Sequence, residues 1–172
     1  MAELYRKAMD MLYFACVVIS GVSLVLISAV IPYGVYTRYV VNRAASWPEP
    51  MAILLTIVLT FFGAAACYRI GMHMRVGLLA NLLPAAGQRV AAFICEILMA
   101  ILAIFMAVYG KGLVEATWYS SIDAFPALSV GVTYLPIPLG GVVMLFFVIE
   151  RLTIGPPPPD AVGDAHGAAA FD

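Results

Sequence analysis

The chain has 172 residues, of which 64% are hydrophobic and 11% are charged, and its formal net charge is -1. Soluble domains carry about 25% charged residues, so this composition, with a mean hydropathy of +1.01, excludes a soluble globular domain and indicates an integral membrane protein. The near-neutral charge also gives no support for a nucleic-acid partner.

Four segments are long and apolar enough to cross the hydrocarbon core as helices, which takes about 20 residues each. They are expected at residues 11–33, 50–68, 88–112 and 130–149. Because lipid admits only helices or closed barrels, and strand-like alternation is missing, residues 1–154 are predicted to form an all-α integral membrane domain. The first segment is too long for the apolar part of a signal peptide, so we expect it to be retained.

The connection between the second and third segments differs from an ordinary loop. Residues 71–87 carry an apolar face that includes Val76 and Leu79, with His73 and Arg75 among the apolar residues. This pattern predicts a short amphipathic helix that lies in the membrane interface, with its polar residues at the headgroups. Residues 155–172 contain four consecutive prolines and are small and acidic, which predicts a disordered tail.

Basic residues near the segment ends indicate the orientation, because cytoplasmic loops are enriched in Lys and Arg. One side carries Arg6, Lys7, Arg69, Arg75, Arg89 and Arg151, and the other carries Arg38, Arg43 and Lys111. Both termini are therefore expected in the cytoplasm of a multi-pass protein of the bacterial inner membrane.

Glu96 is the ionisable residue that lies clearly within an apolar segment. A buried carboxylate is costly and is a functional candidate by default. Three interpretations stay open: a structural ion pair with a basic group of this chain or a partner, a step in a proton or ion path, and exposure to lipid. Glu96 begins a stripe of small residues at helical spacing, which favours the structural pair because such a stripe faces protein. The stripe continues through Ala100, Ala103, Ala107 and Gly110.

A second stripe of small residues follows the second segment, at Ala52, Thr56, Thr60 and Ala64. Such faces let helices approach closely. The sequence leaves open whether this face packs within the chain or against another subunit.

The sequence gives no sign of a cofactor or of enzymatic chemistry. A membrane cytochrome needs axial histidines inside its spans, and the two histidines, His73 and His166, lie outside them. The three cysteines are not spaced like a metal or redox pair. No catalytic, cofactor-binding or metal-binding residue is predicted. We name seven candidate contacts with another subunit or with lipid: Arg38, Trp47, Glu49, Arg69, His73, Arg75 and Glu96.

Taken in order, these residues resemble the small, DctQ-type membrane subunit of tripartite ATP-independent periplasmic (TRAP) transporters. The family pattern R-Y-x-x-N-x-x-x-x-W-x-E-E is matched by Arg38-Tyr39, Asn42, Trp47 and Glu49. Its later motifs are matched by Gly63-Ala64, Arg69, His73, Arg75-Val76, Leu82-Leu83, Pro84, Tyr134 and 136–140. Two acids of the pattern are replaced, by Pro50 and by Gly77.

The resemblance implies an accessory scaffold subunit without enzymatic activity. It implies a large membrane partner that carries the substrate and sodium sites. It also implies a periplasmic binding protein that delivers an organic acid such as a dicarboxylate. The competing hypothesis is an autonomous homo-oligomeric transporter that uses Glu96 as its coupling residue.

Overall fold

A computed structural model describes residues 2–43, 45–71, 85–122 and 125–153 of the chain. His73 and Arg75, most of the predicted interfacial helix and the predicted tail lie outside these described residues.

Four helical stretches in the described part are long and apolar enough to cross a membrane, as the sequence predicted. They comprise α1 (Ala2–Tyr39), α2 (Pro48–Arg69), α4 (Ala85–Thr117), and α5 (Val130–Tyr134) together with α6 (Pro136–Thr153). The strands β1 (Ser121–Ile122) and β2 (Phe125–Ser129) pair antiparallel before α5, outside the spanning helices.

Two of the helices differ in form from the apolar segments expected from the sequence. Pro32 was expected near the end of the first span, but α1 continues past it to Tyr39. Membrane helices accept proline because local adjustments satisfy the freed carbonyl group. The last span is interrupted at Leu135, since Pro136 has no N–H group with which to continue the helical hydrogen bonds of α5.

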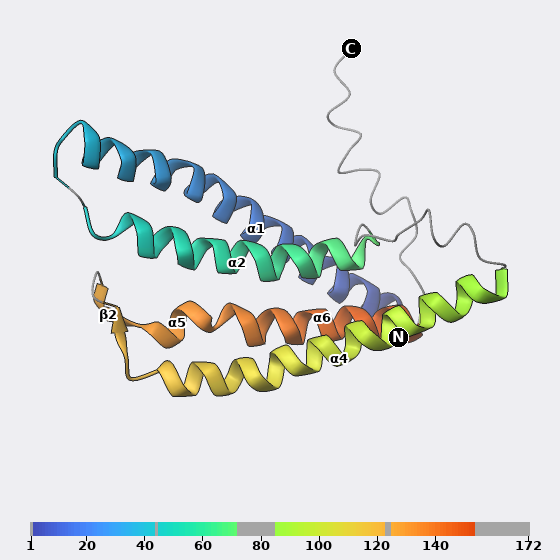
Figure 1. The fold of residues 1–172 in the computed structure, drawn as a ribbon. Helices are drawn as coiled ribbons and strands as arrows, with labels where there is room; N and C mark the ends of the chain where they lie inside the picture. Colours follow the sequence, from blue (N-terminus) through green and yellow to red (C-terminus); the bar gives the residue numbers. More distant parts are fainter. Residues whose placement is uncertain (1, 44, 72–84, 123–124, 154–172) are drawn as a thin grey trace, which may run out of the picture.

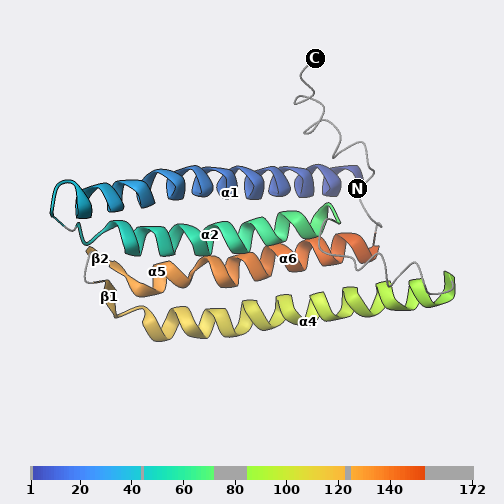
Figure 2. The same cartoon turned by 45° about the horizontal axis from the view of Figure 1, so that its top comes forward.

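The helices stand in a row rather than in a square bundle. α1 packs along α2, α2 along α6, and α6 along α4, so α1 and α4 form the two edges (Figure 2). The helix that is third in the sequence is therefore outermost. Figure 1 shows that α1 crosses α2 at an angle and approaches α6 near the N-terminus.

The buried core lies toward the N-terminal end of this row. It includes Met9 of α1, Tyr68 of α2, Ala103 of α4, and Met144 and Phe147 of α6. The described residues leave the edge helices largely uncovered, and only 6% of the most apolar part of α4 is buried among them. Lipid or another protein must cover these apolar faces.

Close backbone approach holds α4 against α6. A Cβ atom at Gly141 of α6 would lie 2.8 Å from the backbone nitrogen of Ala107 and 2.9 Å from the carbonyl oxygen of Ala103. Ala103 and Gly110 are buried, and Glu96, Ala100 and Ala107 are half-buried. The stripe that begins at Glu96 thus faces protein, and the protein that it faces is α6 of the same chain.

Candidate functional site: an ionic cluster and a groove between α1 and α2

Charged side chains from all four spanning helices meet near the N-terminal end of the row, together with the hydroxyl of Tyr68. We call this group the ionic cluster; it consists of Asp10, Tyr68, Arg69, Glu96, Glu150 and Arg151. Its position depends on where α2 ends. Gly71 has a φ of +72°, and its N–H donates to the carbonyl of Tyr68, which terminates the helix and leaves Arg69 in the last turn.

Arg69 binds two carboxylates at once. Its Nε and Nη2 donate to Glu150 of α6 at 2.9 Å each, and Nη2 also lies 2.6 Å from Oδ1 of Asp10 on α1. The guanidinium carbon lies 5.5 Å from the ring centroids of both Tyr13 and Phe147. The planar guanidinium group suits this forked pairing and stacking, which a lysine would not reproduce.

The second half of the cluster contains Glu96. Nε of Arg151 lies 2.7 Å from a carboxylate oxygen of Glu96, and the hydroxyl of Tyr68 donates to the same carboxylate. Arg151 also lies over the Tyr68 ring, 5.6 Å from its centroid. Glu96 therefore has a basic partner within its own chain, in agreement with the structural interpretation of this residue.

The cluster acts as a connection between helices. The Arg69 half joins α1, α2 and α6, whereas the Arg151 half joins α2, α4 and α6. Its three acids and two arginines all have partners. Sequence analysis named Arg69 and Glu96 as candidate contacts but not Glu150 or Arg151, of which Arg151 served only to indicate the orientation. A signal for their role was available in the sequence. Glu150 and Arg151 are adjacent at the end of the last apolar segment, on the same side of the membrane as Arg69 at the end of the second.

The small-residue stripe of α2 faces differently from the stripe of α4. Thr56 and Thr60 are exposed, and each hydroxyl donates to a carbonyl four residues earlier, at 2.7 Å. Ala52 and Ala64 are half-buried. The described residues thus leave the threonine side of this stripe uncovered.

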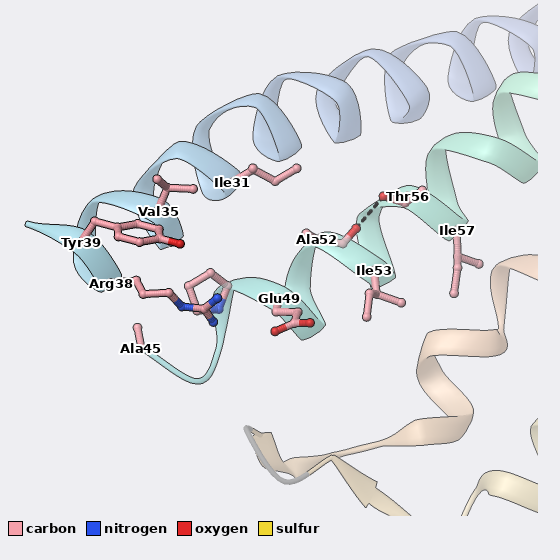
Figure 3. Close-up of a pocket in the computed structure, with 12 residues that line it drawn as sticks. Ile31, Val35, Arg38, Tyr39, Ala45, Glu49, Ala52, Ile53, Thr56 and Ile57 are labelled. Atoms are coloured by element: carbon pink, nitrogen blue, oxygen red, sulfur yellow. Dashed lines mark hydrogen bonds between the residues drawn. The ribbon is translucent and has the colours of Figure 1, made fainter. Parts of the chain in front are cut away.

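A groove of about 530 Å³ lies between α1 and α2 at the opposite end of the row from the ionic cluster (Figure 3). We call it the α1–α2 groove. Arg38 and Glu49 are both exposed and both line it. Trp47 is half-buried beside the groove, with its ring centroid 5.4 Å from that of Tyr33. The other lining residues are mostly apolar: Ile31, Gly34, Val35, Tyr39, Ala45, Pro48, Ala52, Ile53, Thr56 and Ile57.

Asn42 lies in the connection between α1 and α2, where the backbone conformation favours an asparagine. Asn42 has a φ of +53°, a left-handed conformation that asparagine tolerates better than most residues. The chain can thus turn after Tyr39 and bring Glu49 back beside Arg38. Within the described residues, no group of three or more His, Cys, Asp or Glu side chains is arranged to hold a metal ion.

Comparison with known proteins places these features in a family. Residues 27–153 match the family described as tripartite ATP-independent periplasmic transporters, DctQ component. The chain belongs to this DctQ family. It is also 27% identical, over 152 residues, to a protein of Haemophilus influenzae named "Putative TRAP transporter small permease protein". That alignment covers 88% of this chain and 89% of the relative.

Membership of the DctQ family makes the chain the small permease component of a transporter and a multi-pass membrane protein. The family consists of transporter subunits and not of enzymes. The matched region contains the α1–α2 groove and four members of the ionic cluster that carry charge. Asp10, the fifth charged member, precedes it.

Proposed function

We propose that this DctQ subunit is an accessory scaffold in a sodium-coupled TRAP secondary transporter. A larger membrane subunit would carry the substrate and sodium sites. A periplasmic solute-binding protein would deliver an organic acid such as a dicarboxylate. The observation that carries this proposal is the ionic cluster, in which every charged side chain is already engaged in joining one helix to another.

Four of the hydroxyl groups in the spans support the same proposal, whereas those of Ser20 and Thr133 are buried without a hydrogen-bond partner within the described residues. Ser23, Ser28, Thr56 and Thr60 each donate to a carbonyl of their own helix. These four hydroxyls are satisfied within their own helices and so are not linked to one another by hydrogen bonds between helices. A subunit of this kind braces a partner more readily than it conducts a solute.

The exposed part of α2 around Thr60, beyond the α1–α2 groove that Ala52 and Thr56 line, is the face that we propose for docking with the large subunit. Helix association in membranes depends on close van der Waals packing, which small residues permit. The stripe on α4 is already covered by α6. The stripe on α2 is therefore the available small-residue face among the described residues.

Uptake by reconstituted vesicles tests the proposal. We expect no substrate uptake by vesicles that contain this chain alone, and uptake when the large subunit and the binding protein are both added. Uptake by this chain alone would reject the scaffold function and favour an autonomous transporter. In that event Glu96→Gln should abolish uptake, whereas in the complete scaffold system it should leave uptake per assembled complex unchanged.

We further propose that the protein lies in the bacterial inner membrane with both termini, and hence the ionic cluster, on the cytoplasmic side. The α1–α2 groove then faces the periplasmic leaflet. Ser46, which is exposed between α1 and α2, offers a test. In a chain whose native cysteines are replaced by alanine, Ser46→Cys should react with an impermeant maleimide from the periplasm. Labelling only after the inner membrane is broken would reverse this orientation.

A further inference from the structure

We propose that the α1–α2 groove binds a phospholipid with a primary-amine headgroup, of which phosphatidylethanolamine is the representative. Arg38 would hold the lipid phosphate, and Glu49 would hold the ammonium group. The site is a property of this chain and does not depend on the scaffold function proposed above.

The shape of the groove suits an acyl chain that enters from the membrane. It lies between two spanning helices, and Ile31 and Val35 of α1 and Ile53 and Ile57 of α2 are among the apolar residues that line it. From Arg38 to Ile31 the α1 wall extends roughly 10 Å, at about 1.5 Å per residue. The groove can therefore hold the upper part of an acyl chain, and its volume of about 530 Å³ lies within the usual range of ligand sites.

The groove mouth lies at the level of lipid headgroups. Arg38 is in the last turn of α1 and Glu49 is in the first turn of α2, so both flank the apolar parts of their helices. The Tyr33–Trp47 ring pair lies at the same end, and Tyr and Trp side chains concentrate at membrane interfaces.

The charges at the mouth complement a zwitterion. In Figure 3 the Arg38 side chain extends from α1 toward the start of α2, where Glu49 lies. Neither side chain forms an ion pair within the described residues, so both can receive a ligand. A guanidinium binds phosphate through two parallel hydrogen bonds. A carboxylate accepts hydrogen bonds from a primary ammonium group, whereas the quaternary amine of phosphatidylcholine has none to donate.

A second groove provides the internal comparison. It lies between α4 and α6 and has a similar volume of about 560 Å³, with Lys111 and Glu115 on its wall. Those two side chains lie 3.6 Å apart as an ion pair, so they neutralise each other. The α1–α2 groove differs because neither Arg38 nor Glu49 forms an ion pair within the described residues.

Native mass spectrometry of the purified full-length chain tests the site, with phosphatidylethanolamine, phosphatidylglycerol and phosphatidylcholine added in turn. The unmodified chain should retain phosphatidylethanolamine about three- to fivefold better than the other two, the gain expected from an exposed charge-assisted contact. Glu49→Gln should remove this preference while phosphatidylglycerol is still retained. Arg38→Gln should weaken retention of all three lipids, because it removes the phosphate contact.

Lys111→Gln is the matched control, since it alters a charge in the other groove and should leave the preference unchanged. Equal retention of the three lipids by the unmodified chain would overturn the proposal, and would be the result if the groove receives a helix of another protein. An equal loss in Lys111→Gln would also overturn it. Arg38 and Glu49 are exposed, so their variants should fold, and a thermal unfolding scan of each verifies this.

Discussion

The guanidinium of Arg69 and the carboxylate of Glu150 form a two-pronged ion pair across 81 positions of sequence, with both donor–acceptor distances at 2.9 Å. Both side chains are only 6% exposed. The pair joins the end of α2 to the end of α6, and Asp10 brings α1 to the same guanidinium.

Arg69→Ala should strongly destabilise the chain, because it leaves the Glu150 carboxylate buried without its partner. Removal of one member of a buried ion pair typically costs about 3–5 kcal/mol. The free energy of unfolding of the purified chain in detergent micelles measures the effect. Arg43→Ala, at an exposed position, is the control and should change that free energy by less than about 0.5 kcal/mol. Similar losses in the two variants would contradict the structural role of Arg69.

An exchange of charge between Glu96 and Arg151 tests the other half of the cluster. Glu96→Arg alone places two guanidinium groups together and should lower the unfolding temperature. Arg151→Glu, added to it, restores opposite charges at the 2.7 Å contact and should recover part of that loss. Recovery should be incomplete because Tyr68 donates to the original carboxylate. If the double variant is less stable than Glu96→Arg alone, the two residues do not act as a pair.

Gly141→Ala should separate α6 from α4. The added Cβ would lie under 3.0 Å from two backbone atoms of α4, which cannot rotate away as a side chain would. Overpacking of this kind costs about 1–3 kcal/mol. Gly112→Ala is the matched variant on α4, since no atom lies within 4 Å of its Cβ position. Alanine is the better helix former, so thermal unfolding should show Gly112→Ala to be neutral or stabilising and Gly141→Ala to be destabilising.

Thr60→Trp should weaken association with the large subunit without destabilising this chain on its own. Thr60 is exposed, so the isolated chain can accommodate the larger side chain, whereas a closely packed partner helix cannot. Co-purification from cells that express both subunits should fall several-fold. Val108→Trp, at an exposed position of the edge helix α4, is the control. An unchanged yield with Thr60→Trp would show that the partner docks elsewhere.

Much of the fold follows from local sequence signals. The number of spanning helices was predicted because each apolar run must satisfy its own backbone hydrogen bonds in lipid. The stripe from Glu96 to Gly110 was predicted to face protein because its spacing repeats once per helical turn, and it does so.

Other features depend on contacts between distant residues, which one sequence does not reveal. That Arg69 pairs with Glu150 and Arg151 with Glu96 depends on the order of the helices in the row, and several orders suit the same four spans. The continuation of α1 through Pro32 and the interruption at Leu135 also differ from a simple hydropathy estimate. In both cases the effect of proline depends on its surroundings.

The outermost position of α4 has a consequence for how the protein is made. α4 is synthesised before α6, yet α6 supplies both the surface on which α4 packs and the Arg151 guanidinium that pairs with Glu96. During translation, α4 therefore reaches the membrane with a carboxylate that has no cationic partner yet, which is costly in lipid. A chain that stops before α5 should accordingly lose α4 to membrane proteases, while α1 and α2, which pack on each other, persist. We therefore expect α4 to become stable in the bilayer only when α6 has inserted beside it.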